Sequence, residues 1–156
     1  MRLLVLANET CASGAVRSAV ADMATTHGTP SDVLVVSPCL SRSRFSHWMS
    51  ASVVPDRAVA EARLDQSVAA LCADGLPARG ELGDADPLQA LDDAVRVYHP
   101  DRIIIATHTP ERSQWLERNV VVAASARFDE PITHVVVDLD AEAAVAGGGA
   151  TAVPTK

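Results

Sequence analysis

The sequence predicts an α/β fold: a doubly wound, Rossmann-like or flavodoxin-like parallel sheet of five strands with four helices. Short, continuously apolar runs alternate with amphipathic stretches, as in a parallel sheet covered by helices on both faces. The length of 156 residues, 48% of them hydrophobic, suits one domain with a full core. We assign that domain to residues 1–140 and expect a disordered tail over 141–156, where large apolar residues are scarce.

The first strand is predicted over Leu3–Ala7, because so continuously apolar a run requires burial on both faces. It therefore belongs at the centre of the sheet. A helix follows, with Thr10 or Ser13 available as its cap and Gly28 at its end. Its apolar residues recur at helical spacing: Val16, Ala19, Val20, Met23 and Ala24.

The second strand, Asp32–Ser37, repeats the apolar signature and stops at Pro38, which has no N–H to donate to a sheet. After an irregular connection, one face of a second helix is marked by Leu64, Val68, Leu71 and Cys72. A short strand over Ala78–Leu82 comes next. Its glycine and its low apolar content suit an edge of the sheet.

The third helix is expected to begin with Asp86 as its cap and Pro87 in its first turn, with Leu88, Leu91 and Val95 on its buried face. Two buried strands follow, Arg102–Ala106 and Ile132–Val137. Between them, residues 120–122 favour a strand locally, but the apolar residues keep helical spacing. We predict a helix there, because adjacent parallel strands need a covering crossover. The expected strand order is 3-2-1-4-5.

Charge and composition argue against several classes of protein. The net charge of −7 disfavours general binding to nucleic acid, since contacts to backbone phosphates need concentrated Lys and Arg. No apolar run approaches the roughly 20 residues of a membrane-spanning helix, and Glu9 closes the first run without a signal-peptide pattern. We therefore expect a soluble cytoplasmic protein with Cys11, Cys39 and Cys72 as reduced thiols. Their spacing predicts no metal site.

Two local features each allow two interpretations. Residues 41–48, Ser41 to Trp48, combine two arginines with two aromatic side chains, which suits either a phosphate or base contact or a solvated loop. Cys11 lies near a helix start, where the helix dipole lowers the pKa of a thiol, but a cysteine packed inertly fits the same place.

The carboxyl ends of the strands locate a candidate site, because doubly wound folds bind ligands there, where the strand order reverses. Arg112 offers a bidentate fork for an anion and Ser113 precedes free helix N–H groups, or the two are a surface charge and a helix cap. His108 stands at a strand end, whereas His134 is interpreted as a core or interface residue. The candidate ligand-binding residues are Ala7, Asn8, Thr10, Ser37, Ala106, Thr107, His108, Thr109, Arg112 and Ser113.

Four short motifs occur in order along the chain: Asn8-Glu9-Thr10, Gly83-Asp84-Ala85-Asp86-Pro87, Thr107-His108, and Pro131 followed by Val135-Val136-Val137. In this order they resemble the universal stress protein family, of the HUP type with an adenine nucleotide alpha hydrolase-like fold. The resemblance covers nearly all of residues 1–140. It implies that the turn after the first strand contacts adenine and ribose, while the loop after the fourth wraps phosphates. The residues carried over are Asn8, Thr10, Ala106, Thr107 and His108.

One loop departs from the family pattern. ATP-binding members carry G-x2-G-x9-G-[ST], in which glycines let backbone N–H groups close around phosphate oxygens. In this chain, residues 109–115 stand at the first two glycines and Arg118-Asn119 at the last pair. Pro110 removes one N–H, and Glu111 adds a negative charge. We therefore expect that ATP is not bound in the usual manner, and that any ligand is a nucleotide, ATP or AMP, or another anion.

Binding or regulation is favoured over catalysis. The sequence has no GxGxxG after the first strand, no Walker loop, no GxSxG elbow and no HExxH. We expect a universal stress protein-like binding or regulatory protein in the stress response, with a degenerate nucleotide site and no catalytic residue. The alternative is an enzyme that acts on a nucleotide or phosphorylated metabolite through His108, Arg112 and Ser113.

The last strand, Ile132–Val137, predicts a homodimer. In the order 3-2-1-4-5 this strand is an edge, and it carries no Lys, Pro or internal charge to discourage pairing with a second copy. Family members that the chain resembles often dimerise there. The competing interpretation is that the tail after Asp140 folds back over this edge.

Overall fold

Five strands and four helices alternate along the part of the chain that the computed structural model describes, residues 1–7, 13–39, 54–109, 115–138 and 140–141. All strand pairs are parallel, in the order β3-β2-β1-β4-β5. The predicted fold class and strand order are thereby confirmed. The elements are β1 (Arg2–Leu6), α1 (Gly14–His27), β2 (Asp32–Pro38), α2 (Val54–Ala73), β3 (Ala78–Gly83), α3 (Pro87–Tyr98), β4 (Arg102–His108), α4 (Trp115–Arg127) and β5 (Ile132–Val137).

The helix starts follow the local capping chemistry of the sequence. Ser13 caps α1, with its Oγ accepting a hydrogen bond from the N–H of Val16 at 3.2 Å. Asp86 caps α3 in the same way, and Pro87 begins that helix, where its missing N–H costs no hydrogen bond. Gly28 ends α1 with a φ of 91°, a value that glycine adopts readily. These predicted helix boundaries are confirmed.

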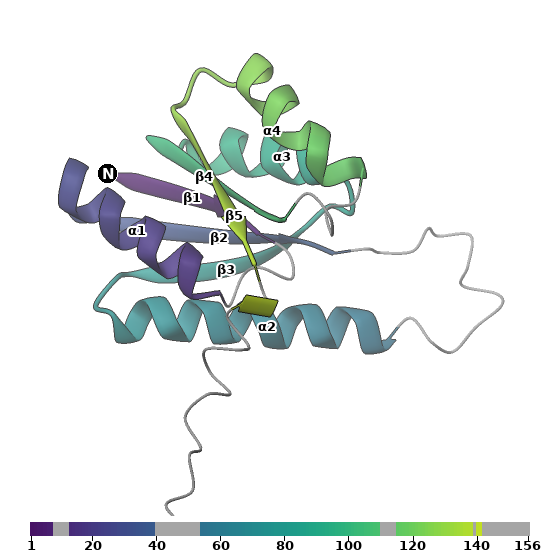
Figure 1. The fold of residues 1–156 in the computed structure, drawn as a ribbon, viewed down its shortest axis with the longest axis horizontal. Coiled ribbons are helices and arrows are strands. Elements are labelled where there is room, and N and C mark those ends of the chain that lie inside the picture. The colour runs from purple at the N-terminus through teal and green to yellow at the C-terminus, as the bar shows by residue number, and fades with distance from the viewer. Residues whose placement is uncertain (8–12, 40–53, 110–114, 139, 142–156) are drawn as a thin grey trace, which may run out of the picture.

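The three central strands of the sheet are buried on both faces. The edge strands β3 and β5 are partly exposed, so the expectation that Ile132–Val137 is a buried strand was wrong. Figure 1 shows α1 and α2 on one face and α3 and α4 on the other. Successive strand side chains point to opposite faces, so Leu3 and Val5 pack with α1 and α2, whereas Leu4 and Leu6 pack with α3 and α4. This double burial explains why the central strands are almost continuously apolar.

The segment with three consecutive valines is helical, as predicted. In α4, Val120 and Ala124 are buried against the sheet, while Val122 is 72% exposed. The need for a crossover between β4 and β5 therefore outweighs the local strand preference of β-branched residues.

One side chain on α2 differs from expectation. Leu64 and Leu71 are buried, and Val68 packs against the same core, but Cys72 is exposed. Its Sγ donates a hydrogen bond to the carbonyl of Ala78 at 3.6 Å. The placement of Cys72 on the buried face was wrong, because neighbouring residues lie about 100° apart around a helix, so that with Leu71 buried the adjacent Cys72 faces outward.

Several expectations fall outside the described residues: the Ser41 to Trp48 stretch, Cys11 and the tail from residue 142 onward. Where side chains are described, Cys39 and Cys72 are free thiols. Among the described residues, no helix is long and apolar enough to cross a membrane, and no group of three or more His, Cys, Asp or Glu side chains is arranged to hold a metal ion.

Candidate functional site

Three adjacent strands end side by side at the carboxyl edge of the sheet. The N–H of Ala7, directly after β1, donates to the carbonyl of Val36 in β2 at 3.0 Å. Ser37 lies next along β2, and Ala106 lies near the end of β4 on the other side of β1. All three are at most 8% exposed, so the predicted residues Ala7, Ser37 and Ala106 share a small, buried edge.

At this edge the connections between strands change from one face of the sheet to the other. After β1 the chain crosses one face of the sheet through α1 to reach β2, whereas α3 brings it back across the other face to β4. The carboxyl ends of β1 and β4 therefore mark the topological switch point, where doubly wound folds bind their ligands.

Two polar residues end β4 in buried surroundings. Thr107 and His108 are 5% and 8% exposed, respectively. Thr107 Oγ1 donates to the carbonyl of His108 at 3.2 Å and lies 2.8 Å from Nε2 of His134 on β5. A hydroxyl has a single hydrogen, so while that hydrogen points at the carbonyl, the Nε2–H of His134 must donate to Oγ1. Thr107 thus ties the end of β4 to β5.

His134 is the residue that sequence reasoning placed least well. It is exposed, so its interpretation as a core residue was wrong, while an interface role stays a prediction. Its Nε2 reaches Thr107 because β4 and β5 pair in parallel with Ile105 opposite His134, which puts the two side chains on one face of the sheet. Only this register reveals the contact.

The structure places part of the candidate set. It brings together Ala7, Ser37 and the run from Ala106 to Thr109, of which Thr109 is half-buried just after β4. Four other candidates lie outside the described residues: Asn8, Thr10, Arg112 and Ser113. The ligand-binding role of the whole set stays a prediction.

Several solved structures are similar to this chain over most of its length. A universal stress protein from Archaeoglobus fulgidus superimposes with a TM-score of 0.59 at 16% identity, over 86% of this chain and 93% of that one. The chain has the universal stress protein fold. A universal stress protein family member from Arabidopsis thaliana with AMP bound gives 0.56 at 13% identity, over 90% and 94%. A universal stress protein from A. fulgidus in complex with dAMP gives 0.51 at 13%, over 86% and 97%.

The universal stress protein fold is carried here by a divergent sequence. No protein-family model matches the chain, and no curated protein matches it by sequence. What this chain shares with the solved universal stress proteins is therefore their fold.

Proposed function

We propose that this chain is a binding or regulatory protein of the universal stress type, acting in the stress response. The site at the carboxyl ends of β1 and β4 binds a small anionic ligand, a nucleoside monophosphate such as AMP, and does not bind Mg-ATP in the usual manner. One observation carries the proposal: the small buried residues Ala7, Ser37 and Ala106 lie at or near the carboxyl ends of β1, β2 and β4. Solved structures with this fold include one with AMP bound and one in complex with dAMP.

The preference against a triphosphate rests on the sequence that joins β4 to α4. Each additional phosphate adds negative charge, which needs backbone N–H groups or cationic side chains nearby. Pro110 offers no N–H, Glu111 repels phosphate, and glycines that bring the backbone close to phosphate are missing from residues 109–119. A ligand with a single phosphate requires less of this loop.

The polar pair at the end of β4 supports binding over catalysis. A hydroxyl is activated as a nucleophile when it donates its hydrogen to a neighbouring base. Thr107 Oγ1 instead donates to the carbonyl of His108, and with its hydrogen in that orientation the contact with His134 requires the tautomer that carries Nε2–H. This arrangement orients the strand end and does not activate an attacking oxygen.

Calorimetric titration with AMP and with Mg-ATP tests the proposal. We expect saturable AMP binding. The affinity for Mg-ATP should be weaker than that for AMP by at least about tenfold, which is the effect of one missing charge-assisted hydrogen bond. His108→Ala, at the end of β4, should weaken AMP binding about fivefold if its ring contacts the ligand. His27→Ala, an exposed histidine ending α1 at the opposite edge of the sheet, is the matched control and should leave affinity unchanged.

Two results would count against the proposal. A micromolar dissociation constant for Mg-ATP would show that the altered loop still holds a triphosphate. Turnover of ATP that His108→Ala abolishes and His27→Ala preserves would instead support the alternative, an enzyme that acts on a nucleotide.

A further inference from the structure

The edge strand β5 accompanies β4 as far as the carboxyl edge of the sheet. The register of β1 with β4 reaches Leu6 opposite Ile105. The register of β5 with β4 continues to His108, which lies opposite Val137. Figure 1 shows β4 and β5 as neighbours, and their pairing is parallel. The placement of Thr107 and His108, two of the candidate ligand-binding residues, therefore depends on β5.

A side-chain contact adds to this pairing, on the face of the sheet that α3 and α4 cover. Ile103 and Ile105 of β4 pack in the core on that face, and Thr107 follows them at the same two-residue spacing. The Oγ1 of Thr107 lies 2.8 Å from Nε2 of His134 and 3.2 Å from the carbonyl oxygen of His108. Thr107 is 5% exposed, whereas His134 is exposed. The contact thus joins the surface of β5 to a buried strand end.

The two contacts of Thr107 Oγ1 need two hydrogens. If Nε2 of His134 carries a hydrogen, it donates to Oγ1, and the hydroxyl donates its own hydrogen to the carbonyl of His108. If Nε2 is bare, the hydroxyl donates to the ring, and two oxygens face each other 3.2 Å apart with no hydrogen between them. The first arrangement satisfies both contacts. The imidazolium form preserves it, because Nε2 carries a hydrogen in that form too.

We infer that His134 is a positioning residue for the ligand site at the end of β4, an inference that rests on the proposed function. Its Nε2–H directs the hydroxyl of Thr107 to the carbonyl of His108, and hydrogen bonds in such a chain strengthen one another. His134 acts without touching the ligand. It restricts the conformations of the strand end, so that less conformational freedom is lost when the ligand binds.

Calorimetric titration with AMP compares the intact chain with two variants of His134. We expect His134→Ala to weaken AMP binding about fivefold, the effect of one lost hydrogen bond. His134→Gln should recover most of the affinity, because its amide N–H replaces the Nε2–H donor. Thr133→Ala is the matched control, on the same strand but on the opposite face, and should bind AMP as the intact chain does.

The partner hydroxyl gives a second test of the same chain of hydrogen bonds. Thr107→Val keeps the branched shape of the side chain and removes the hydroxyl. In this background, His134→Ala should cause no further loss of AMP affinity, because the chain is already broken. Strict additivity of the two substitutions would contradict the inference.

Two NMR measurements on the ligand-free chain do not depend on AMP. A multiple-bond ¹H–¹⁵N spectrum of the His134 ring should show a hydrogen on Nε2. Amide hydrogen exchange over residues 106–108 should be faster in His134→Ala than in the intact chain and in His134→Gln, while the amide of Ile103 keeps its rate.

The outcomes separate this inference from the proposed function. Absence of AMP binding to the intact chain would overturn the proposed function, and the role of His134 with it. AMP binding that His134→Ala leaves unchanged would overturn this inference alone, as would a neutral ring protonated at Nδ1. Equal losses in His134→Ala and His134→Gln, or in His134→Ala and Thr133→Ala, would assign the effect to packing of β5 and overturn it too. Thermal unfolding shows that each variant is folded at the temperature of the titration.

Discussion

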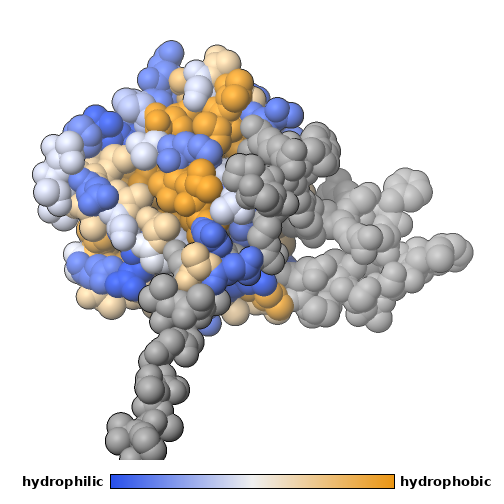
Figure 2. Space-filling view, viewed as in Figure 1, coloured by the Kyte–Doolittle hydropathy of each residue, from blue (hydrophilic) through white to orange (hydrophobic). Residues whose placement is uncertain are grey.

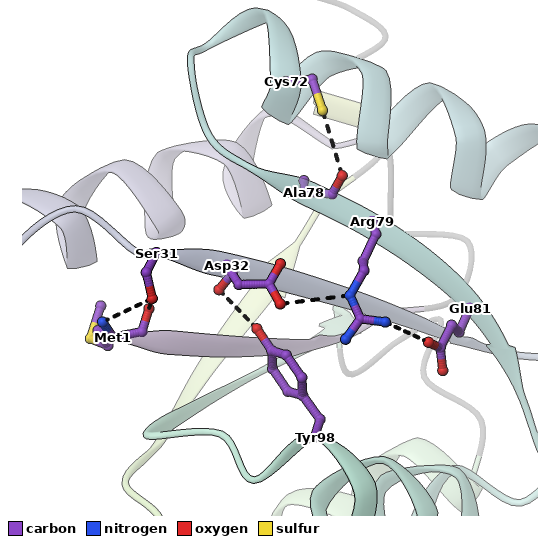
Figure 3. Close-up of polar contacts among 8 residues, drawn as sticks. All are labelled: Met1, Ser31, Asp32, Cys72, Ala78, Arg79, Glu81 and Tyr98. Carbon is purple, nitrogen blue, oxygen red and sulfur yellow. Dashed lines mark hydrogen bonds and ion pairs between the residues drawn. The ribbon is translucent and has the colours of Figure 1, made fainter.

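At the residue scale, Tyr98 is a polar side chain held by several neighbours at once. Its hydroxyl donates to the carbonyl of Asp32 at 2.8 Å, and the guanidinium of Arg79 lies over its ring (Figure 3). Burial, with the neighbouring Asp32 carboxylate, raises the pKa of the Tyr98 phenol from 10.0 to about 12. The fold therefore favours the neutral phenol.

The raised pKa of Tyr98 predicts a loss of stability in alkali. The neutral phenol's contribution is fully present below pH 10 and is lost as the pH rises through about 12. We expect the free energy of unfolding of the intact chain, measured with urea, to fall more steeply between these pH values than that of Tyr98→Phe. At pH 8 that variant should be less stable by about 1 kcal/mol, for the lost hydrogen bond. Tyr98 is the only tyrosine and Lys156 the only lysine, so few other groups titrate in this window. Parallel pH profiles would refute the assignment.

Residue roles were predictable where their causes are local. Ser13 and Asp86 were recognised as caps because a cap bonds to an N–H two or three residues further along the chain. The contact between Thr107 and His134 joins residues 27 apart and depends on the register of β4 and β5. No periodicity in the sequence fixes that register, so this part of the candidate site required the structure.

At the element scale, the alternation of strands and helices was predictable. Each buried strand is continuously apolar, and each crossover carries apolar residues at helical spacing. The close docking of α3 on β3 was not predictable. A Cβ added at Gly83 would lie 2.7 Å from Cβ of Ala90 and 2.9 Å from Cγ1 of Val36. Gly83 therefore lets α3 approach the edge strand β3 closely.

This approach predicts a cost for a single methyl group. Gly83→Ala should lower the free energy of unfolding by about 1–3 kcal/mol, because Ala90 has no rotamer through which it can yield. Val97→Ala, at an exposed residue of the same helix, should change it by no more than about 0.5 kcal/mol. Urea denaturation measures both. Adding Ala90→Gly should recover part of the Gly83→Ala loss in a double-mutant cycle, and strict additivity would contradict the clash.

At the scale of the whole molecule, the two edges of the sheet differ. The edge strand β3 carries the exposed charges of Arg79 and Glu81, which discourage pairing with another chain. The edge strand β5 carries no Lys, Asp or Glu. Val136 on this strand is 50% exposed, and Val122 on α4 is 72% exposed. Figure 2 shows apolar surface gathered on the face where β5 runs between α4 and α1. Of the two edges, β5 is the better suited to receive a second copy.

We propose that the chain forms a homodimer through β5, and Val136→Lys is the variant that tests it. Pairing two β5 strands satisfies their outer backbone groups and removes apolar area from water, which stabilises the dimer by about 25 cal/mol per Å². A lysine at residue 136 places like charges near the two-fold axis, so we expect light scattering to give a dimer mass for the intact chain and a monomer mass for Val136→Lys.

Val97→Lys makes the same change at a residue 82% exposed on α3 and should remain dimeric. Removing residues 142–156 should also leave the dimer intact, whereas stronger association on their removal would mean that the tail covers β5. A monomeric intact chain well above micromolar concentration removes the proposal, and a dimer indifferent to Val136→Lys moves the interface elsewhere.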